Sequence, residues 1–161
     1  MKNINLPLKK GSTLFLKLVI IFMGLAVFGI TGIALPYEMI TNGIHNDLLF
    51  FVLLYLTCVP FYFALYQGMK LLGYIDKDTA FSMNSVKALD KIKYCAMVMT
   101  VLYVACLPWI FRAADEEDAP GMILMWMAVC GAPLVIAVFA SLLQILLENV
   151  LDIKSENDLT V

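Results

Sequence analysis

Thiols and imidazoles are the side chains most often used for nucleophilic, redox and metal chemistry, and this chain has few of them. Its four cysteines include no C-x-x-C pair and have no neighbouring histidine, so we expect small apolar packing residues: Cys58, Cys95, Cys106 and Cys130. The single histidine, His45, falls in a short connection and is expected to be solvated. The Walker, HExxH and GxSxG motifs are absent from the sequence. We therefore predict no catalytic residue, no metal ligand, no cofactor and no enzyme.

Phenol groups recur on one side of the second long apolar stretch. Members of this stripe are three or four residues apart, as on one face of a helix: Phe51, Tyr55, Cys58, Tyr62 and Tyr66. One interpretation is that the phenols hydrogen-bond to the backbone of neighbouring helices. The other is a pocket inside the bundle for an amphipathic ligand or a lipid, lined by Tyr55, Tyr62, Tyr66, Gln67 and Gln144. The sequence leaves both interpretations open.

A run of four acidic residues forms the third candidate site: Asp115, Glu116, Glu117 and Asp118. Such a run attracts cations by Coulomb interaction, so a divalent ion or a basic antimicrobial peptide is a candidate ligand. The alternative is a solvated loop that helps to hold the two flanking helices in place.

The rest of the chain must position these groups, and its composition is that of a membrane protein. Hydrophobic residues make up 62% of the chain and charged residues 15%, with a mean hydropathy of +0.88. Four stretches contain no Asp, Glu, Lys or Arg, namely 18–37, 48–69, 94–111 and 119–147. Each is close to or above the roughly 20 residues that an α-helix needs to cross a bilayer. We predict an all-α integral membrane four-helix bundle, with helices at about 13–36, 47–72, 93–112 and 120–148. The first stretch is longer than a typical signal-peptide core, so we expect it to be retained.

Basic residues are distributed very unevenly over the two sides of this topology. One side receives Lys2, Lys9, Lys10, Lys17, Lys70, Lys77, Lys87, Lys91, Lys93 and Lys154, and the other receives Arg112. The positive-inside rule then places both termini in the cytoplasm, so we expect the chain in the cytoplasmic membrane. The net charge of −2 gives no basis for direct nucleic-acid binding.

Proline and small residues shape the expected bundle. Prolines inside the spans should bend their helices: Pro60, Pro108 and Pro133. Pairs of small residues on the fourth helix permit close approach of a neighbour: Ala128 with Ala132, and Ala137 with Ser141. The spans contain no ionisable residue of the kind that ion-coupled transport needs, so a proton-coupled pump is not expected.

Two segments that we expect in the cytoplasm have patterns typical of helices. Ser82 is a predicted N-cap, with Phe81 and Val86 as a hydrophobic staple, and starts an amphipathic helix at about 82–93. We expect that helix to lie on the inner leaflet, as a lipid anchor or as a docking surface. The fourth helix is expected to continue as an amphipathic extension, with the apolar positions Leu143, Leu146, Val150 and Ile153. An acidic tail, 149–161, follows and ends in a mobile apolar tip.

The same two segments carry a family resemblance. The stretch Asp78–Leu89, with Ile92 following, and the closing Glu156–Val161 resemble the YoaS-like domain of unknown function, a family of small four-helix bacterial membrane proteins. Asp90-Lys91 departs from the more basic pair expected there. The resemblance implies a gene often encoded beside a small Cro-type helix-turn-helix regulator, and it brings no activity and no site residues with it.

Our leading hypothesis is therefore a membrane sensor or regulatory protein that acts through its cytoplasmic face on such a regulator. The candidate partner surface is Ser82, Lys87, Asp90, Lys91, Glu148, Asp152, Glu156 and Asp158. Membrane lipids are the other expected partners. The alternatives are an immunity or transport-like protein that binds a hydrophobic or cationic compound, and a structural accessory subunit of a larger membrane protein.

Overall fold

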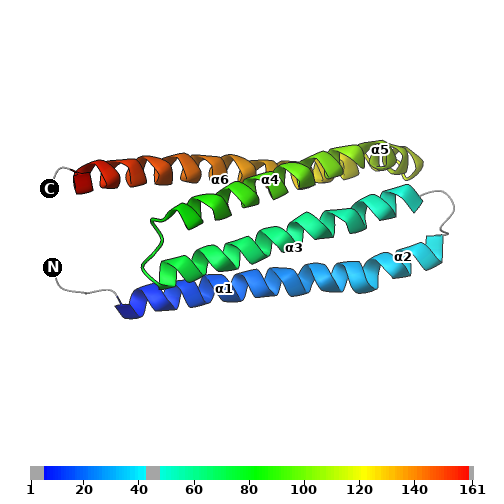
Figure 1. Cartoon of the computed structure of the whole chain (residues 1–161). Helices are drawn as coiled ribbons and strands as arrows, with labels where there is room; N and C mark the ends of the chain where they lie inside the picture. The colour runs from blue at the N-terminus through cyan, green and yellow to red at the C-terminus, as the bar shows by residue number, and fades with distance from the viewer. Residues whose placement is uncertain (1–5, 43–47, 160–161) are drawn as a thin grey trace.

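The computed structural model describes residues 6–42 and 48–159, and these ranges are entirely helical apart from short turns (Figure 1). His45, Asp47 and the apolar tip at Thr160 and Val161 lie outside the described residues. The elements are α1 (Leu6–Gly29), a π-helical segment η1 (Ile30–Ala34), α2 (Leu35–Asn42), α3 (Leu48–Asp76), α4 (Met83–Ala105), α5 (Leu107–Glu116) and α6 (Gly121–Leu159). Four candidate membrane spans, 11–37, 48–76, 83–116 and 121–156, are long and apolar enough to cross a bilayer. The predicted all-α class with four spans is confirmed.

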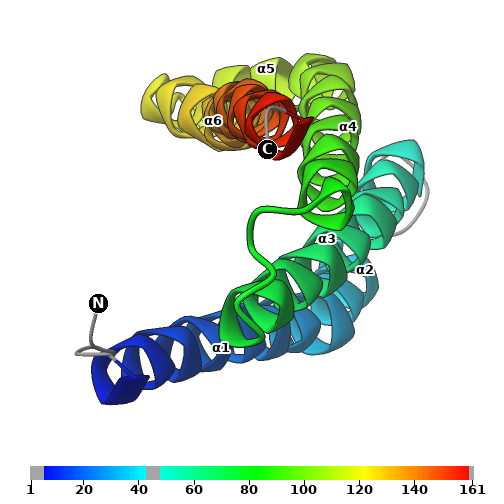
Figure 2. The same cartoon turned by 60° about the vertical axis from the view of Figure 1, so that its left-hand side comes forward.

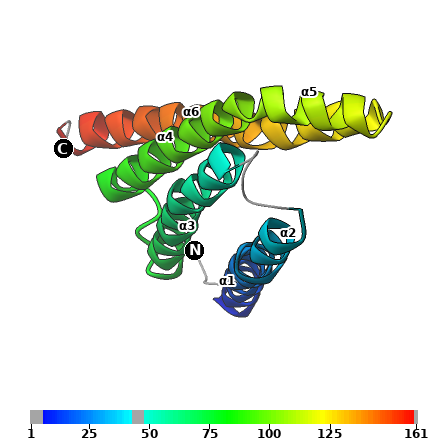
Figure 3. The ribbon, with the colours of Figure 1, turned by 90° about the vertical axis from the view of Figure 1, so that its right-hand side faces the viewer.

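The helices pack in chain order and form an open array. The extensive contacts are those of α1 with α3, α3 with α4, and α4 with α6. Figures 2 and 3 show the consequence, with α1 and α6 on opposite sides and α3 and α4 between them. The first and last described residues lie at the same end as the α3–α4 connection, which we call the terminus end (Figure 1). The α5–α6 connection lies at the opposite end, which we call the far end.

The cytoplasmic helix expected at 82–93 is part of a longer element. Ser82 is the N-cap, with an extended backbone, and α4 then runs without a break from Met83 to Ala105. Val86 and Leu89 are each only 6% exposed, so the apolar face of this segment packs inside the protein. A separate helix on the inner leaflet was therefore a wrong prediction, because that face is covered by the neighbouring helices of the array. Phe81 is 62% exposed and does not share the burial of Val86, so the staple is not supported.

Small residues allow α4 and α6 to approach each other. On α4 the buried side chains include Ser85, Ala88 and Ala96, and on α6 they include Ala137 and Ala140. Short side chains of this kind let two helix backbones come close. The predicted small residues Ala128 and Ala132 are exposed instead and contribute no buried contact.

Two glycines lie in the seam between α1 and α3. A Cβ atom added at Gly24 would lie 3.4 Å from Leu65 Cδ1, and one added at Gly68 would lie 3.5 Å from Ile20 Cδ1. Each glycine thus faces a side chain of the other helix at the distance of ordinary van der Waals contact. The two helices lie side by side in Figure 1, in agreement with these contacts.

Proline interrupts the first helix in a way the sequence analysis did not anticipate. In the π-helical register of η1, the Leu35 N–H bonds to Ile30 O, so the next bond would run from residue 36 to Thr31 O. Residue 36 is Pro36, which has no N–H, and the Thr31 carbonyl loses its backbone donor. The Tyr55 hydroxyl on α3 donates to that carbonyl at 2.9 Å.

The third span is interrupted as well. It breaks at Cys106, where α4 ends, and Pro108 lies in the first turn of α5. Trp126 Nε1 on α6 donates to Tyr103 O at 3.0 Å, beside this break. Tyr103 O also accepts the Cys106 N–H at 3.2 Å, so the indole is a second donor to this carbonyl. In contrast, α3 and α6 continue as helices through Pro60 and Pro133, whose predicted bends stay predictions.

Trp126→Phe should test the bond between α6 and α4, because it removes the indole N–H and retains a ring. We expect the free energy of unfolding in detergent to fall by about 0.5–1.5 kcal/mol, the range for one hydrogen bond in such surroundings. The matched control is Trp109→Phe, since both tryptophans contact the ring of Phe50. Within the described residues the Trp109 indole makes no hydrogen bond, so an equal loss in both variants would contradict the assignment.

Candidate functional site at the terminus end

A chain of polar side chains joins α4 to α6 towards the terminus end. Lys93 Nζ lies 3.0 Å from Asp90 Oδ1 and donates to Gln144 Oε1 at 3.1 Å. Gln144 Nε2 donates onward to Glu148 Oε1 at 3.1 Å. We call these four residues the α4–α6 lock. Because each member has a partner of complementary charge or hydrogen-bonding type, the lock fixes the register of α6 against α4.

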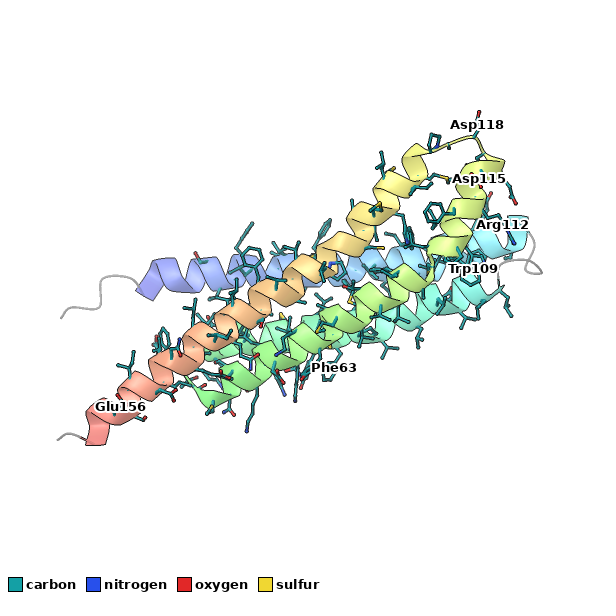
Figure 4. All side chains as sticks on the ribbon, turned by 90° about the horizontal axis from the view of Figure 1, so that it is seen from above. Phe63, Trp109, Arg112, Asp115, Asp118 and Glu156 are labelled. Carbon is teal, nitrogen blue, oxygen red and sulfur yellow. The ribbon has the colours of Figure 1, made fainter. Side chains whose placement is uncertain are left out.

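After Gln144, α6 continues as a helical C-terminal arm, residues 145–159, whose first turn includes Glu148 of the lock. Its length is about 22 Å at about 1.5 Å per residue. One face of the arm exposes the apolar side chains Leu146, Val150 and Ile153. Asp152 and Glu156 are exposed as well, and Figure 4 shows Glu156 near the tip of α6. The predicted amphipathic extension is therefore present as a continuous helix that runs to Leu159.

The predicted partner surface separates into two groups. Asp90 and Glu148 belong to the lock, so their carboxylates are already engaged inside the protein. Ser82 caps α4 by position, with its hydroxyl 3.4 Å from that of Ser85. The side chain of Asp158 lies outside the described residues. The exposed remainder is Lys87, Lys91, Asp152 and Glu156.

The contacts found for the predicted tyrosine pocket do not join its members into one site. Tyr55 and Tyr62 donate their hydroxyls to Thr31 O at 2.9 Å and Gly24 O at 3.0 Å, across the α1–α3 seam. This is the first of the two interpretations offered by the sequence. The remaining three members lie elsewhere by their contacts. Tyr66 lies under the ammonium of Lys70, Gln67 is buried, and Gln144 belongs to the lock.

The acidic run at the far end forms the corner between α5 and α6. All four side chains are exposed: Asp115, Glu116, Glu117 and Asp118. Asp118 adopts a positive φ of 49°, a left-handed conformation that turns the chain into α6. Figure 4 shows Asp115, Asp118 and Arg112 at this corner. Among the described residues, no group of three or more His, Cys, Asp or Glu is placed to hold a metal ion. The corner therefore offers a diffuse negative surface rather than a chelating site.

Sequence reasoning missed Lys93 as the centre of the lock. The signal was available, because Lys93 is the last charge before the uncharged stretch 94–111. A cation at that depth needs a polar partner, and Gln144 is among the few polar side chains in the fourth span. Their pairing could not be inferred without knowing that α4 and α6 are neighbours.

Gln144→Met should weaken the lock, because it retains the shape of the side chain and removes both hydrogen bonds. We expect the free energy of unfolding to fall by about 1–2 kcal/mol, since both bonds involve charged partners. Asn149→Met is the matched control, an exposed amide on the same helix. Chemical denaturation in detergent measures both variants, and equal stability of the two would show that the lock contributes nothing.

Comparison with known proteins agrees with this architecture. The family described as a protein of unknown function, DUF2975, matches residues 33–161. The chain is 44% identical over 160 residues to the uncharacterized membrane protein YoaS of Bacillus subtilis strain 168, with 96% of this chain and 100% of the relative covered. No solved structure matches the chain significantly. The resemblance to the YoaS-like family is thereby confirmed, and the chain belongs to the DUF2975 family of multi-pass membrane proteins.

Proposed function

We propose that this protein is a non-enzymatic sensor or regulatory protein of the bacterial cytoplasmic membrane, which binds a cytoplasmic partner through its terminus end. The observation that carries the proposal is the C-terminal arm. It continues α6 after Gln144 and exposes an apolar stripe beside two carboxylates. An amphipathic helix with a free face is a common means of binding another protein.

Charge supports a cytoplasmic position for the terminus end. The lysines between 70 and 93 lie there, on or beside the α3–α4 connection, and the far-end corner carries the acidic run. Lysine-rich connections are retained on the cytoplasmic side during insertion. Both termini are then cytoplasmic, and the acidic corner faces outward.

Reporter fusions test this orientation. A green fluorescent protein fused after Val161 should fluoresce, and alkaline phosphatase at the same position should be inactive. Alkaline phosphatase inserted after Glu117, in the far-end corner, should be active. Active phosphatase at the C-terminus would exclude a cytoplasmic partner.

The kind of partner follows from the chemistry of the arm. Asp152 and Glu156 are four residues apart on one helix and exposed, so they present two negative charges on one side. A DNA-binding protein has a basic surface that otherwise contacts phosphates, and carboxylates can occupy that surface. The small Cro-type helix-turn-helix regulator suggested by the family resemblance has this character. Binding to the arm would hold the regulator at the membrane and away from DNA.

Neutralising the arm should weaken capture of a purified small Cro-type helix-turn-helix regulator. For Asp152→Asn with Glu156→Gln we expect about tenfold weaker binding, because two charge pairs of roughly 0.7 kcal/mol each are lost. Deletion of residues 154–161 should abolish capture. Binding is measured with the full chain in detergent at two salt concentrations.

The matched control is Asp115→Asn with Glu116→Gln, which removes the same charge from the far-end corner. Equal affinity for the native chain and the arm variant would overturn the proposed role of the arm. If the control variant weakened binding of the regulator equally, the effect would come from the net charge of the protein and not from the arm.

A further inference from the structure

Three lysines lie at one edge of the apolar slab, the layer formed by the uncharged stretches of the four spans. Lys17 precedes the first uncharged stretch, Lys70 follows the second, and Lys93 precedes the third. The bond from Tyr62 to Gly24 O sets the register of α3 against α1. Counted from that bond, Lys17 and Lys70 both lie about 10–12 Å towards the terminus end, at about 1.5 Å per residue. The two lysines are thus at nearly the same depth.

Two of these lysines are neutralised within the protein. Lys17 forms an ion pair with Asp76, and Lys93 forms one with Asp90. Lys70 differs, because within the described part of the chain it makes no salt bridge. Its ammonium instead lies 4.8 Å from the ring centroid of Tyr66. This cation–π contact orients the charge without compensating it.

Tyr66 also differs from the other tyrosines of its stripe. The hydroxyls of Tyr55 and Tyr62 are engaged by α1, whereas the Tyr66 hydroxyl has no hydrogen bond among the described residues. Tyr66 is 54% exposed, and Lys70 is exposed as well. The pair therefore presents one ammonium and one phenol donor together, at the depth of the lipid headgroups.

The surface of α3 between this pair and the middle of the span can accommodate an acyl chain. Val59, Phe63 and Tyr66 follow one another at helical spacing, are exposed, and lead along α3 to Lys70. From residue 59 to residue 70 the rise is about 16 Å, close to half of the roughly 30 Å hydrocarbon thickness. The stripe thus spans one leaflet and ends in a cation.

We propose that this stripe on α3 is a binding site for an anionic phospholipid, with the headgroup phosphate held by Lys70 and Tyr66. The ammonium pairs with the phosphate charge, and the phenol donates a hydrogen bond to a phosphate oxygen. The acyl chain lies along Phe63 and Val59. This site is independent of any cytoplasmic partner and of the C-terminal arm.

Lipid titration of the purified full chain in detergent tests the site. Phosphatidylglycerol should bind and raise the melting temperature more than phosphatidylcholine with the same acyl chains. Lys70→Gln should weaken the phosphatidylglycerol response about fivefold, as expected for one lysine at an anionic surface. Tyr66→Phe should weaken it less, and Lys70→Arg should largely restore it.

The matched control is Lys87→Gln, which removes the same charge from an exposed lysine on α4. It should leave the phosphatidylglycerol response unchanged. Equal responses to the two lipids, or equal loss in Lys70→Gln and Lys87→Gln, would overturn the proposal. Inorganic phosphate that stabilises as well as the lipid would also overturn it, because the site would then be one for a small anion.

Discussion

A backbone carbonyl surrounded by hydrocarbon must find a donor within the protein, because no water is present to supply one. Much of this structure follows from that constraint. Helices satisfy most of their own groups, and proline is the main exception because it lacks an N–H. At Thr31 the carbonyl that loses its backbone donor to Pro36 accepts the Tyr55 hydroxyl, and at Tyr103 the Trp126 indole adds a second donor to a carbonyl that already accepts the Cys106 N–H. These bonds hold η1 to α3 and α6 to α4, so both interruptions are points of attachment.

Charged and polar side chains also join neighbouring helices towards the terminus end. Lys17 pairs with Asp76 across α1 and α3, and the α4–α6 lock joins the other pair of helices. Each helix pair is thus held by an aromatic donor within the apolar slab and by a lysine at its edge. Packing between α3 and α4 then unites the two pairs into an open array. The arrangement leaves broad apolar faces of α1 and α6 to the lipid.

This architecture gives side chains of the same type different surroundings. Carboxylates that appear equivalent in the sequence have different roles, since Asp90 and Glu148 stabilise the lock while Asp152 and Glu156 remain exposed. The same holds for tyrosines, because α1 engages Tyr55 and Tyr62 and leaves Tyr66 with Lys70. Our functional proposals therefore concern exposed groups. The C-terminal arm is proposed to bind a protein partner, and the α3 stripe is proposed to bind a lipid.

The sequence by itself determined the all-α class and the four spans, because the cost of placing charge in hydrocarbon makes uncharged stretches readable directly. It also located the N-cap at Ser82, which depends on local backbone chemistry. Tertiary structure decided which face of each helix is covered. Val86 and Leu89 have the same pattern whether they face lipid or protein, so their burial against neighbouring helices could not be inferred from spacing. The lock and the aromatic donors join residues far apart in the chain, and only the order of helix packing brings them together.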